Sequence, residues 1–125
     1  MLSLEFLGDT ATTQDWNAYR DALLDRVGEY AKQSPDVVRG LTTMDGAAAK
    51  TGHLDAKTHE LIALAVAVTT RCDGCISVHT KKAVEHGATR GEIAEALDVA
   101  IALNAGAALV YSARVLEAHA QLPAA

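Results

Sequence analysis

Both cysteines of this 125-residue chain lie in one short segment, RCDGCISVH, at residues 71–79. His79 follows the second cysteine by four residues. On a helix, Cys72, Cys75 and His79 fall at positions i, i+3 and i+7, on one narrow stripe. Thiols at that spacing can form a disulfide, because their Cα atoms lie within about 4.4–6.8 Å. An imidazole on the same stripe can take a proton from a thiol. The pattern predicts a redox-active dithiol with its own base.

Glu60 is the second residue of chemical interest, because it opens the apolar block 61–68. An unpaired carboxylate is costly in such surroundings. If the chain reverses direction near residues 69–71, Glu60 and His79 lie symmetrically about the bend and come level across a helical hairpin. Glu60 could then hydrogen-bond His79 directly or through a water and fix its tautomer. We therefore expect a proton relay from Glu60 through His79 to a thiol.

The residues alone leave several alternatives open. The thiols could be inert, or they could belong to a zinc site, since zinc takes four ligands and the chain offers Cys72, Cys75, His79 and Glu60. The attacking cysteine is also open. Cys72 lies nearer the start of the expected helix, where free N–H groups favour a thiolate, whereas Cys75 lies one turn from the base. The other histidines are expected on the surface or at helix ends: His53, His59, His86 and His119.

Composition limits the partners of the chain. Half of the residues are hydrophobic, so we expect some apolar surface to be buried against other subunits. The net charge of −5 gives no reason to expect nucleic acid. The longest apolar run, 61–68, is far short of the roughly 20 residues that span a membrane, and the N-terminus shows no signal peptide. Two cysteines three apart are typical of reactive thiols in a reducing compartment. We expect a cytoplasmic protein with no membrane partner.

Hydrophobic periodicity predicts an all-α fold of five to six helices, with no strand, in a single domain over residues 1–125. An amphipathic helix is expected over residues 15–33. The next helix should open at Ser34-Pro35, with serine as N-cap and proline in the first turn, and end at Gly52.

The second half of the chain should contain the remaining helices. Asp55 should cap a helix that carries the apolar block and is buried on all sides. The dithiol helix should begin near Cys72 and stop at Gly87. A capping box that begins at Thr89 should open a final helical region, which residues 104–106, Asn-Ala-Gly, are expected to split into two helices.

Residues 59–60 and the following stretch RCDGCISVHTKKAVEHGATRGEIAEAL resemble the core of the AhpD-like alkylhydroperoxidases, within the carboxymuconolactone decarboxylase superfamily. The matching features are a glutamate twelve residues before the Cys-x-x-Cys pair, a histidine four residues after it, and a downstream helix–glycine–helix. They cover about residues 54–105. The founding members carry a histidine between the cysteines, where this chain has Gly74, so one proton-transfer group is missing here.

The resemblance implies an all-α fold that assembles as a homo-trimer or homo-hexamer and holds no tightly bound cofactor. It also implies reduction of hydrogen peroxide or organic hydroperoxides. In that reaction Cys75 attacks the peroxide, Cys72 resolves the product, and His79 and Glu60 form the proton relay. An external dithiol reductant, a lipoyl-bearing or thioredoxin-like protein, would then reopen the disulfide.

Two rival functions follow from the same residues. A non-redox enzyme resembling the carboxymuconolactone decarboxylases would keep its activity after loss of both thiols. A thiol–disulfide exchange or redox-sensing protein would react with other dithiols but consume almost no peroxide, and Gly74 keeps this alternative open.

Overall fold

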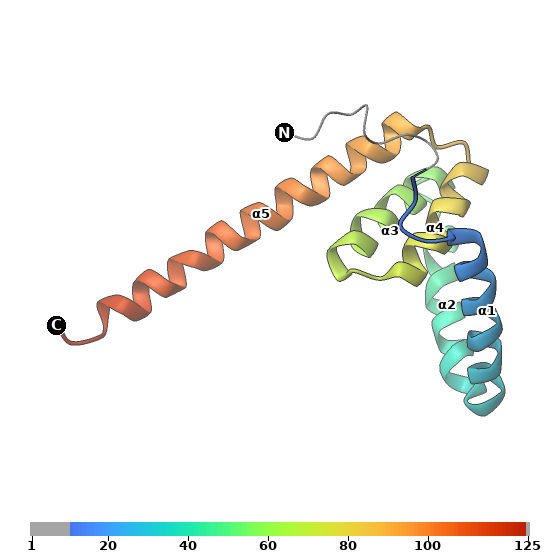
Figure 1. Ribbon diagram of the computed structural model, residues 1–125, viewed down its shortest axis with the longest axis horizontal. Coiled ribbons are helices and arrows are strands. Elements are labelled where there is room, and N and C mark those ends of the chain that lie inside the picture. The colour runs from blue at the N-terminus through green and yellow to red at the C-terminus, as the bar shows by residue number, and fades with distance from the viewer. Residues whose placement is uncertain (1–10, 125) are drawn as a thin grey trace. The chain divides into compact units, whose positions relative to one another are not determined.

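The computed structural model describes residues 11–124 and contains five α-helices, with no strand in that part of the chain (Figure 1). The helices are α1 (Trp16–Gln33), α2 (Pro35–Thr51), α3 (Ala56–Thr70), α4 (Asp73–Glu85) and α5 (Arg90–Ala120). This confirms the predicted all-α class. The chain divides into two compact units, Met1–Thr51 with α1 and α2, and Gly52–Ala125 with α3 to α5. The expectation of one domain stays a prediction, and that of no signal peptide falls on residues 1–10, outside the described residues.

The first unit consists of α1 and α2, joined at Ser34. Asp15 caps α1, as its carboxylate accepts a hydrogen bond from the Ala18 N–H at 3.0 Å. Pro35 is the first residue of α2, where its missing N–H costs nothing. The rings of Trp16 and Tyr19 meet edge to face at 5.9 Å. Neither helix has a buried residue, so residues 11–51 contribute no buried core within this chain.

The second unit positions the dithiol. Asp55 caps α3 by accepting from the Thr58 N–H at 2.8 Å. The predicted capping box is confirmed at the start of α5, where Thr89 and Glu92 bond each other's backbone N–H groups. α3 packs against both α4 and α5. The buried apolar residues among those described are Leu64, Ala67, Ala83 and Ala100. Because three of the four are alanines, the helices of this unit can approach one another closely.

The prediction that α3 is buried on all sides is wrong within one chain. Leu64 and Ala67 are only 3% and 2% exposed, but Ile62 and Val66 are 50% and 55% exposed. The helix is covered where α4 and α5 pack against it, but Ile62 and Val66 line an open groove with Val99 and Leu103 of α5 and are only half covered there. The helix has the composition of a buried element, yet this single chain covers only part of it.

α5 is one helix, so the predicted split at residues 104–106 is also wrong. A glycine inside a helix costs only about 1 kcal/mol relative to alanine, and the neighbouring residues here are mainly good helix formers. Asn104 does not compete with the helix, because its side-chain amide donates to the Ala100 carbonyl at 2.7 Å. The same amide donates to the Thr69 hydroxyl at 2.9 Å and thereby ties α5 to α3.

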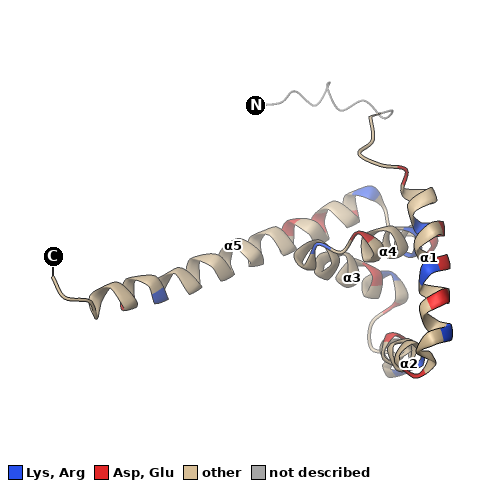
Figure 2. Cartoon of the chain, turned by 60° about the horizontal axis from the view of Figure 1, so that its bottom comes forward, with Lys and Arg blue, Asp and Glu red and all other residues tan. Residues whose placement is uncertain are grey.

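The C-terminal half of α5 projects beyond α3 and α4 (Figure 1). Figure 2 shows it almost free of charge, and no charged residue lies between Asp98 and Arg114. Its large apolar side chains are exposed, with Leu109 and Val110 at 75% and Leu116 at 72%. By length and composition α5 alone among the described helices could cross a membrane. A helix that is apolar around its circumference needs a cover of some kind.

Candidate active site

The turn between α3 and α4 places the first cysteine, and it confirms the predicted bend. α3 ends with Arg71 in the left-handed conformation, at φ 53°. The N–H of Cys72 then donates back to the Ala67 carbonyl at 3.0 Å. This 6→1 bond is one of the two bonds of the Schellman motif, while the Arg71 N–H donates to the same Ala67 carbonyl, as in the simpler left-handed cap. It fixes Cys72 at the junction of the two helices.

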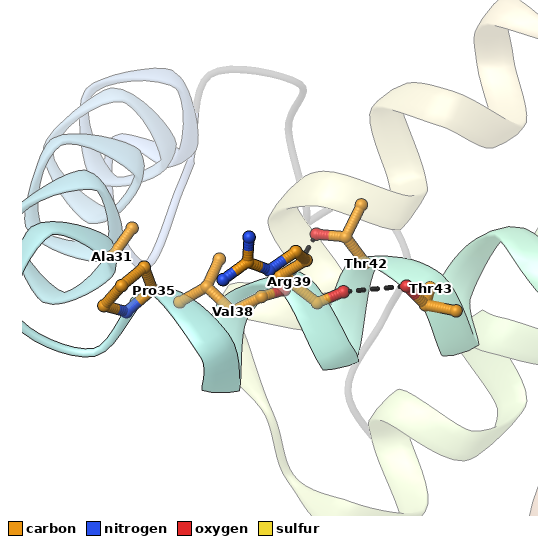
Figure 3. Close-up of a pocket in the computed structure, with 6 residues that line it drawn as sticks. All are labelled: Ala31, Pro35, Val38, Arg39, Thr42 and Thr43. Atoms are coloured by element: carbon orange, nitrogen blue, oxygen red, sulfur yellow. Dashed lines mark hydrogen bonds between the residues drawn. The ribbon is translucent and has the colours of Figure 1, made fainter.

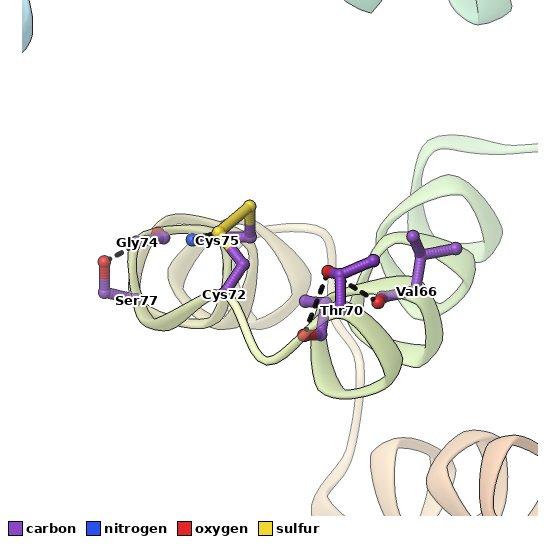
Figure 4. The surroundings of a disulfide bond; sticks show 7 residues. Val66, Thr70, Cys72, Gly74, Cys75 and Ser77 are labelled. Atoms are coloured by element: carbon purple, nitrogen blue, oxygen red, sulfur yellow. Dashed lines mark hydrogen bonds between the residues drawn. A yellow bond between two sulfur atoms is a disulfide. The ribbon is translucent and has the colours of Figure 1, made fainter. Parts of the chain in front are cut away.

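The two cysteines are joined in a disulfide at the start of α4 (Figure 4). Their Cα atoms are 5.2 Å apart, within the range that the spacing predicts. Cys72 is the N-cap of α4, and its sulfur accepts a hydrogen bond from the Cys75 N–H at 3.1 Å. It therefore precedes the helix, and the predicted stripe holds only for Cys75 and His79, which are four residues apart on α4. Both cysteines are half-buried, so each residue is partly open to solvent.

Hydroxyl side chains near the disulfide donate hydrogen bonds to backbone carbonyls of their own helices. The Thr70 hydroxyl, on the neighbouring helix end, donates to the Val66 carbonyl at 3.0 Å (Figure 4). Ser77 is the one buried polar residue among those described, at 3% exposure, and its hydroxyl donates to the Gly74 carbonyl at 2.8 Å. The sequence indicated Thr70 only as part of a bend. Its place beside the disulfide depends on the packing of α3 against α4, which no local pattern reveals.

Glu60 and His79 meet across the hairpin, as the symmetry of the sequence about the bend predicts. Oε2 of Glu60 lies 2.7 Å from Nδ1 of His79. Both side chains are largely covered, at 14% and 21% exposure, and they come from α3 and α4 respectively. An ionised carboxylate can only accept, so the imidazole must donate from Nδ1. In the neutral imidazole this leaves Nε2 as the unprotonated nitrogen, free to accept a proton.

The remaining candidate sites carry less chemistry. Within residues 11–124 no three side chains of His, Cys, Asp or Glu converge where they could hold a metal ion, so the zinc interpretation gains no support. A shallow groove of about 420 Å³ lies between Ala31 of α1 and the start of α2 (Figure 3). Its polar side chains are engaged on α2 itself: Arg39 with Asp36, Thr42 with the Val38 carbonyl and Thr43 with the Arg39 carbonyl. The other histidines are exposed, except half-buried His59.

An ion pair ties the start of α3 to the start of α5. Nζ of Lys57 lies 2.7 Å from Oε2 of Glu92, and both side chains are about one-third exposed, at 33% and 37%. The hydrogen bond from Lys57 lowers the pKa of the Glu92 carboxyl, and the bond from the Thr89 N–H adds to this effect. The same carboxylate raises the pKa of Lys57. The pair fastens the ends of two helices in the unit that carries the dithiol.

Comparison with known proteins places this geometry in a family. The carboxymuconolactone decarboxylase family matches residues 35–118. An uncharacterized protein of Haemophilus influenzae is 52% identical over 105 residues, which are 84% of this chain and 93% of the relative.

Two solved structures have a similar fold. A carboxymuconolactone decarboxylase family protein from Legionella pneumophila, in its apo form, is 37% identical, with a TM-score of 0.67 over 82% of this chain and 92% of that one. A protein from Methanobacterium thermoautotrophicum is 32% identical, with a TM-score of 0.63 over 69% of this chain and 97% of that one. The chain therefore belongs to the carboxymuconolactone decarboxylase family, within the AhpD-like superfamily.

Proposed function

We propose that this protein is a thiol-dependent peroxidase that reduces hydrogen peroxide or organic hydroperoxides. The observation that carries the proposal is the direct contact between Glu60 and His79. A disulfide alone would suit an exchange protein or a sensor equally well. A histidine that a carboxylate orients, one helical turn from Cys75, adds the acid–base function that cleavage of an O–O bond requires.

The first step is oxidation of Cys75. His79 takes the thiol proton at Nε2, and the resulting thiolate attacks the peroxide. A sulfur–oxygen bond forms as the oxygen–oxygen bond breaks, and Cys75 becomes a sulfenic acid. The leaving alkoxide or hydroxide takes the proton from the His79 imidazolium and departs as an alcohol or water. Glu60 holds the imidazole in one orientation and stabilises its charged form, so it acts as a positioning residue.

The second step closes the disulfide. The Cys72 sulfur attacks the sulfenic acid of Cys75, the sulfur–sulfur bond forms as the sulfur–oxygen bond breaks, and water leaves with the Cys72 proton. The N-cap position suits Cys72 to this role, because its sulfur faces the N–H of the residue it must join. A dithiol reductant, lipoyl-bearing or thioredoxin-like, then supplies two electrons and two protons to restore both thiols.

The direct test measures the loss of free protein thiols and does not use a coupled assay. Fully reduced protein, freed of reductant, is mixed by stopped flow with hydrogen peroxide or an organic hydroperoxide, and the remaining free thiols are counted. We expect two protein thiols to be lost for each peroxide consumed, faster than from dithiothreitol at equal thiol concentration. Loss no faster than from dithiothreitol would contradict the proposal and favour an exchange protein. Activity that survives replacement of both cysteines by serine would favour a non-redox enzyme.

We also propose that the working protein is a homo-trimer or homo-hexamer in which α5 packs against other copies. The large apolar side chains of α5 from Val99 onward are exposed in one chain, and the whole described chain buries only four apolar residues. So small a core is insufficient for a chain of this length. A membrane would be an alternative cover. The uncharged stretch between Asp98 and Arg114, however, is shorter than the roughly 20 residues that a membrane span requires.

A further inference from the structure

Two helices of the second unit are followed by a left-handed residue, which is arginine in one turn and glycine in the other. α3 ends with Arg71 at φ 53°, followed by the bond from the Cys72 N–H to the Ala67 carbonyl. Gly87, two residues after the end of α4, has φ 84° and is followed by the equivalent bond, from the Ala88 N–H to the Ala83 carbonyl, at 2.9 Å. Both turns have this 6→1 bond and a left-handed residue, a position where glycine is preferred; the turn after α4 also has the second Schellman bond, from the Gly87 N–H to the Val84 carbonyl at 3.0 Å, whereas the Arg71 N–H donates to the Ala67 carbonyl.

Arginine at this position has a cost in free energy that glycine avoids. A side chain with a Cβ is crowded in the left-handed region, and arginine has none of the local hydrogen bonds that help asparagine or aspartate there. Arg71 is the only non-glycine residue with positive φ among residues 11–124. Backbone strain of this kind clusters at functional sites, and here it lies directly before the first sulfur of the disulfide.

The Arg71 side chain is available for a partner. The residue is exposed, and within the described part of the chain its guanidinium makes no ion pair or hydrogen bond. The opposing charge next to the disulfide is Asp73, the first residue of α4, which is also exposed. In a chain of net charge −5, a free guanidinium beside the reactive pair provides local attraction for an anion.

We propose that Arg71 is a specificity-determining residue for the reductant and that it favours dithiols carrying negative charge near the attacking sulfur. The inference deepens the proposed function, since it concerns how the oxidised enzyme is reduced. A thiolate of the reductant attacks the Cys72 sulfur, and a mixed disulfide forms as the Cys72–Cys75 bond breaks. The Cys75 thiolate leaves and is protonated beside His79. The second thiol of the reductant then attacks its own sulfur in the mixed disulfide, which releases Cys72 as a thiol and oxidises the reductant.

Two small dithiols that differ in charge test this directly. Reduced lipoate and reduced lipoamide have the same dithiol, but the first ends in a carboxylate and the second in a neutral amide. The oxidised protein is mixed with each at low ionic strength, without peroxide, and the appearance of protein thiols gives two rates. We divide the rate with reduced lipoate by the rate with reduced lipoamide. This rate ratio should be about two- to five-fold higher in the wild type than in Arg71→Asn, which is the size of effect that an exposed ion pair has. A high salt concentration should remove this difference between wild type and Arg71→Asn, because salt screens the charges.

Three further variants separate charge from backbone conformation. Arg71→Lys should keep most of the wild-type ratio, whereas Arg71→Gly, which suits the turn better, should raise the melting temperature and lose the preference. Asp73→Asn should increase the preference. The same ratio in wild type, Arg71→Asn and Arg71→Gly would overturn the proposal. Because no peroxide is present, this result is independent of peroxidase activity, and slow peroxide consumption alone would leave the reductant preference intact.

Discussion

The α3–α4 hairpin and α5 belong to the same compact unit, but they differ in the partners of their side chains. In the hairpin, Glu60 contacts His79 and Cys72 forms a disulfide with Cys75, all within one chain. Along α5, only Ala100 is buried, and large apolar side chains such as Leu109 and Leu116 are left exposed. The comparison shows that one chain brings Glu60, His79 and both cysteines together, whereas it leaves most of the surface of α5 exposed.

The largest effect should come from removing the sulfur that meets the peroxide. Cys75→Ser deletes the proposed nucleophile, so peroxide consumption should fall to the rate measured without protein. The neighbouring Ser77→Ala, which removes a hydroxyl from the same helix, is the control and should retain turnover. Peroxide consumption that continues in Cys75→Ser would show that the hairpin does not carry the chemistry.

Breaking the pair across the hairpin should have the next largest effect. His79→Gln removes the base, and the rate of peroxide-driven thiol loss should fall by about 10²–10⁴-fold, the usual contribution of general acid–base catalysis. Glu60→Gln keeps the shape but not the charge and should cost less. His86→Gln, at the exposed end of the same helix, is the matched control. Equal rates in all four proteins, wild type included, would remove the relay from the mechanism.

The same comparison predicts a different outcome for α5. Leu109→Glu combined with Leu116→Glu places two charges on one face of the helix, seven residues apart. If this face packs against other copies, burial of unpaired charge costs several kcal/mol, and sedimentation should show smaller species. Leu109→Met with Leu116→Met keeps the face apolar and should leave the assembly intact. An unchanged sedimentation profile in the glutamate variant would show that this face is not an interface.

The smallest effect concerns the Lys57–Glu92 pair, because it is partly exposed. The pKa of Glu92 is lowered, so its contribution to stability is present above the usual value of 4.5 and is lost as the pH falls through the folded value. The pKa of Lys57 is raised, so its contribution is present below 10.5 and is lost at higher pH. Lys57→Met should lower the melting temperature slightly between these limits. If the melting temperatures of Lys57→Met and wild type differ by the same amount at every pH, the ion pair is excluded as the cause of that difference.

Local signals in the sequence predict much of this fold and its site. Asp55 and Thr89 were identified as caps because capping depends on residues a few positions apart. The contact between Glu60 and His79 was predicted because two helices joined by a short bend must pair symmetrically about it.

The features that were missed depend on tertiary packing. The continuity of α5 through Gly106 depends on summed helix propensity and on a side chain of α3 that bonds Asn104. The exposure of Ile62 and Val66 on α3 depends on how closely α5 packs beside them, since they line an open groove with Val99 and Leu103. The left-handed Arg71 breaks a local rule, and places where local rules fail are expected near functional sites.

The most direct test of the account locates the oxidised sulfur. In Cys72→Ser the disulfide cannot close, so one turnover with peroxide should leave a sulfenic acid that a trapping reagent labels and mass spectrometry assigns. We expect the label on Cys75, formed more slowly when Glu60→Gln is added. A single turnover that leaves Cys75 unlabelled in Cys72→Ser, while Cys75→Ser acquires the label on Cys72, would contradict it.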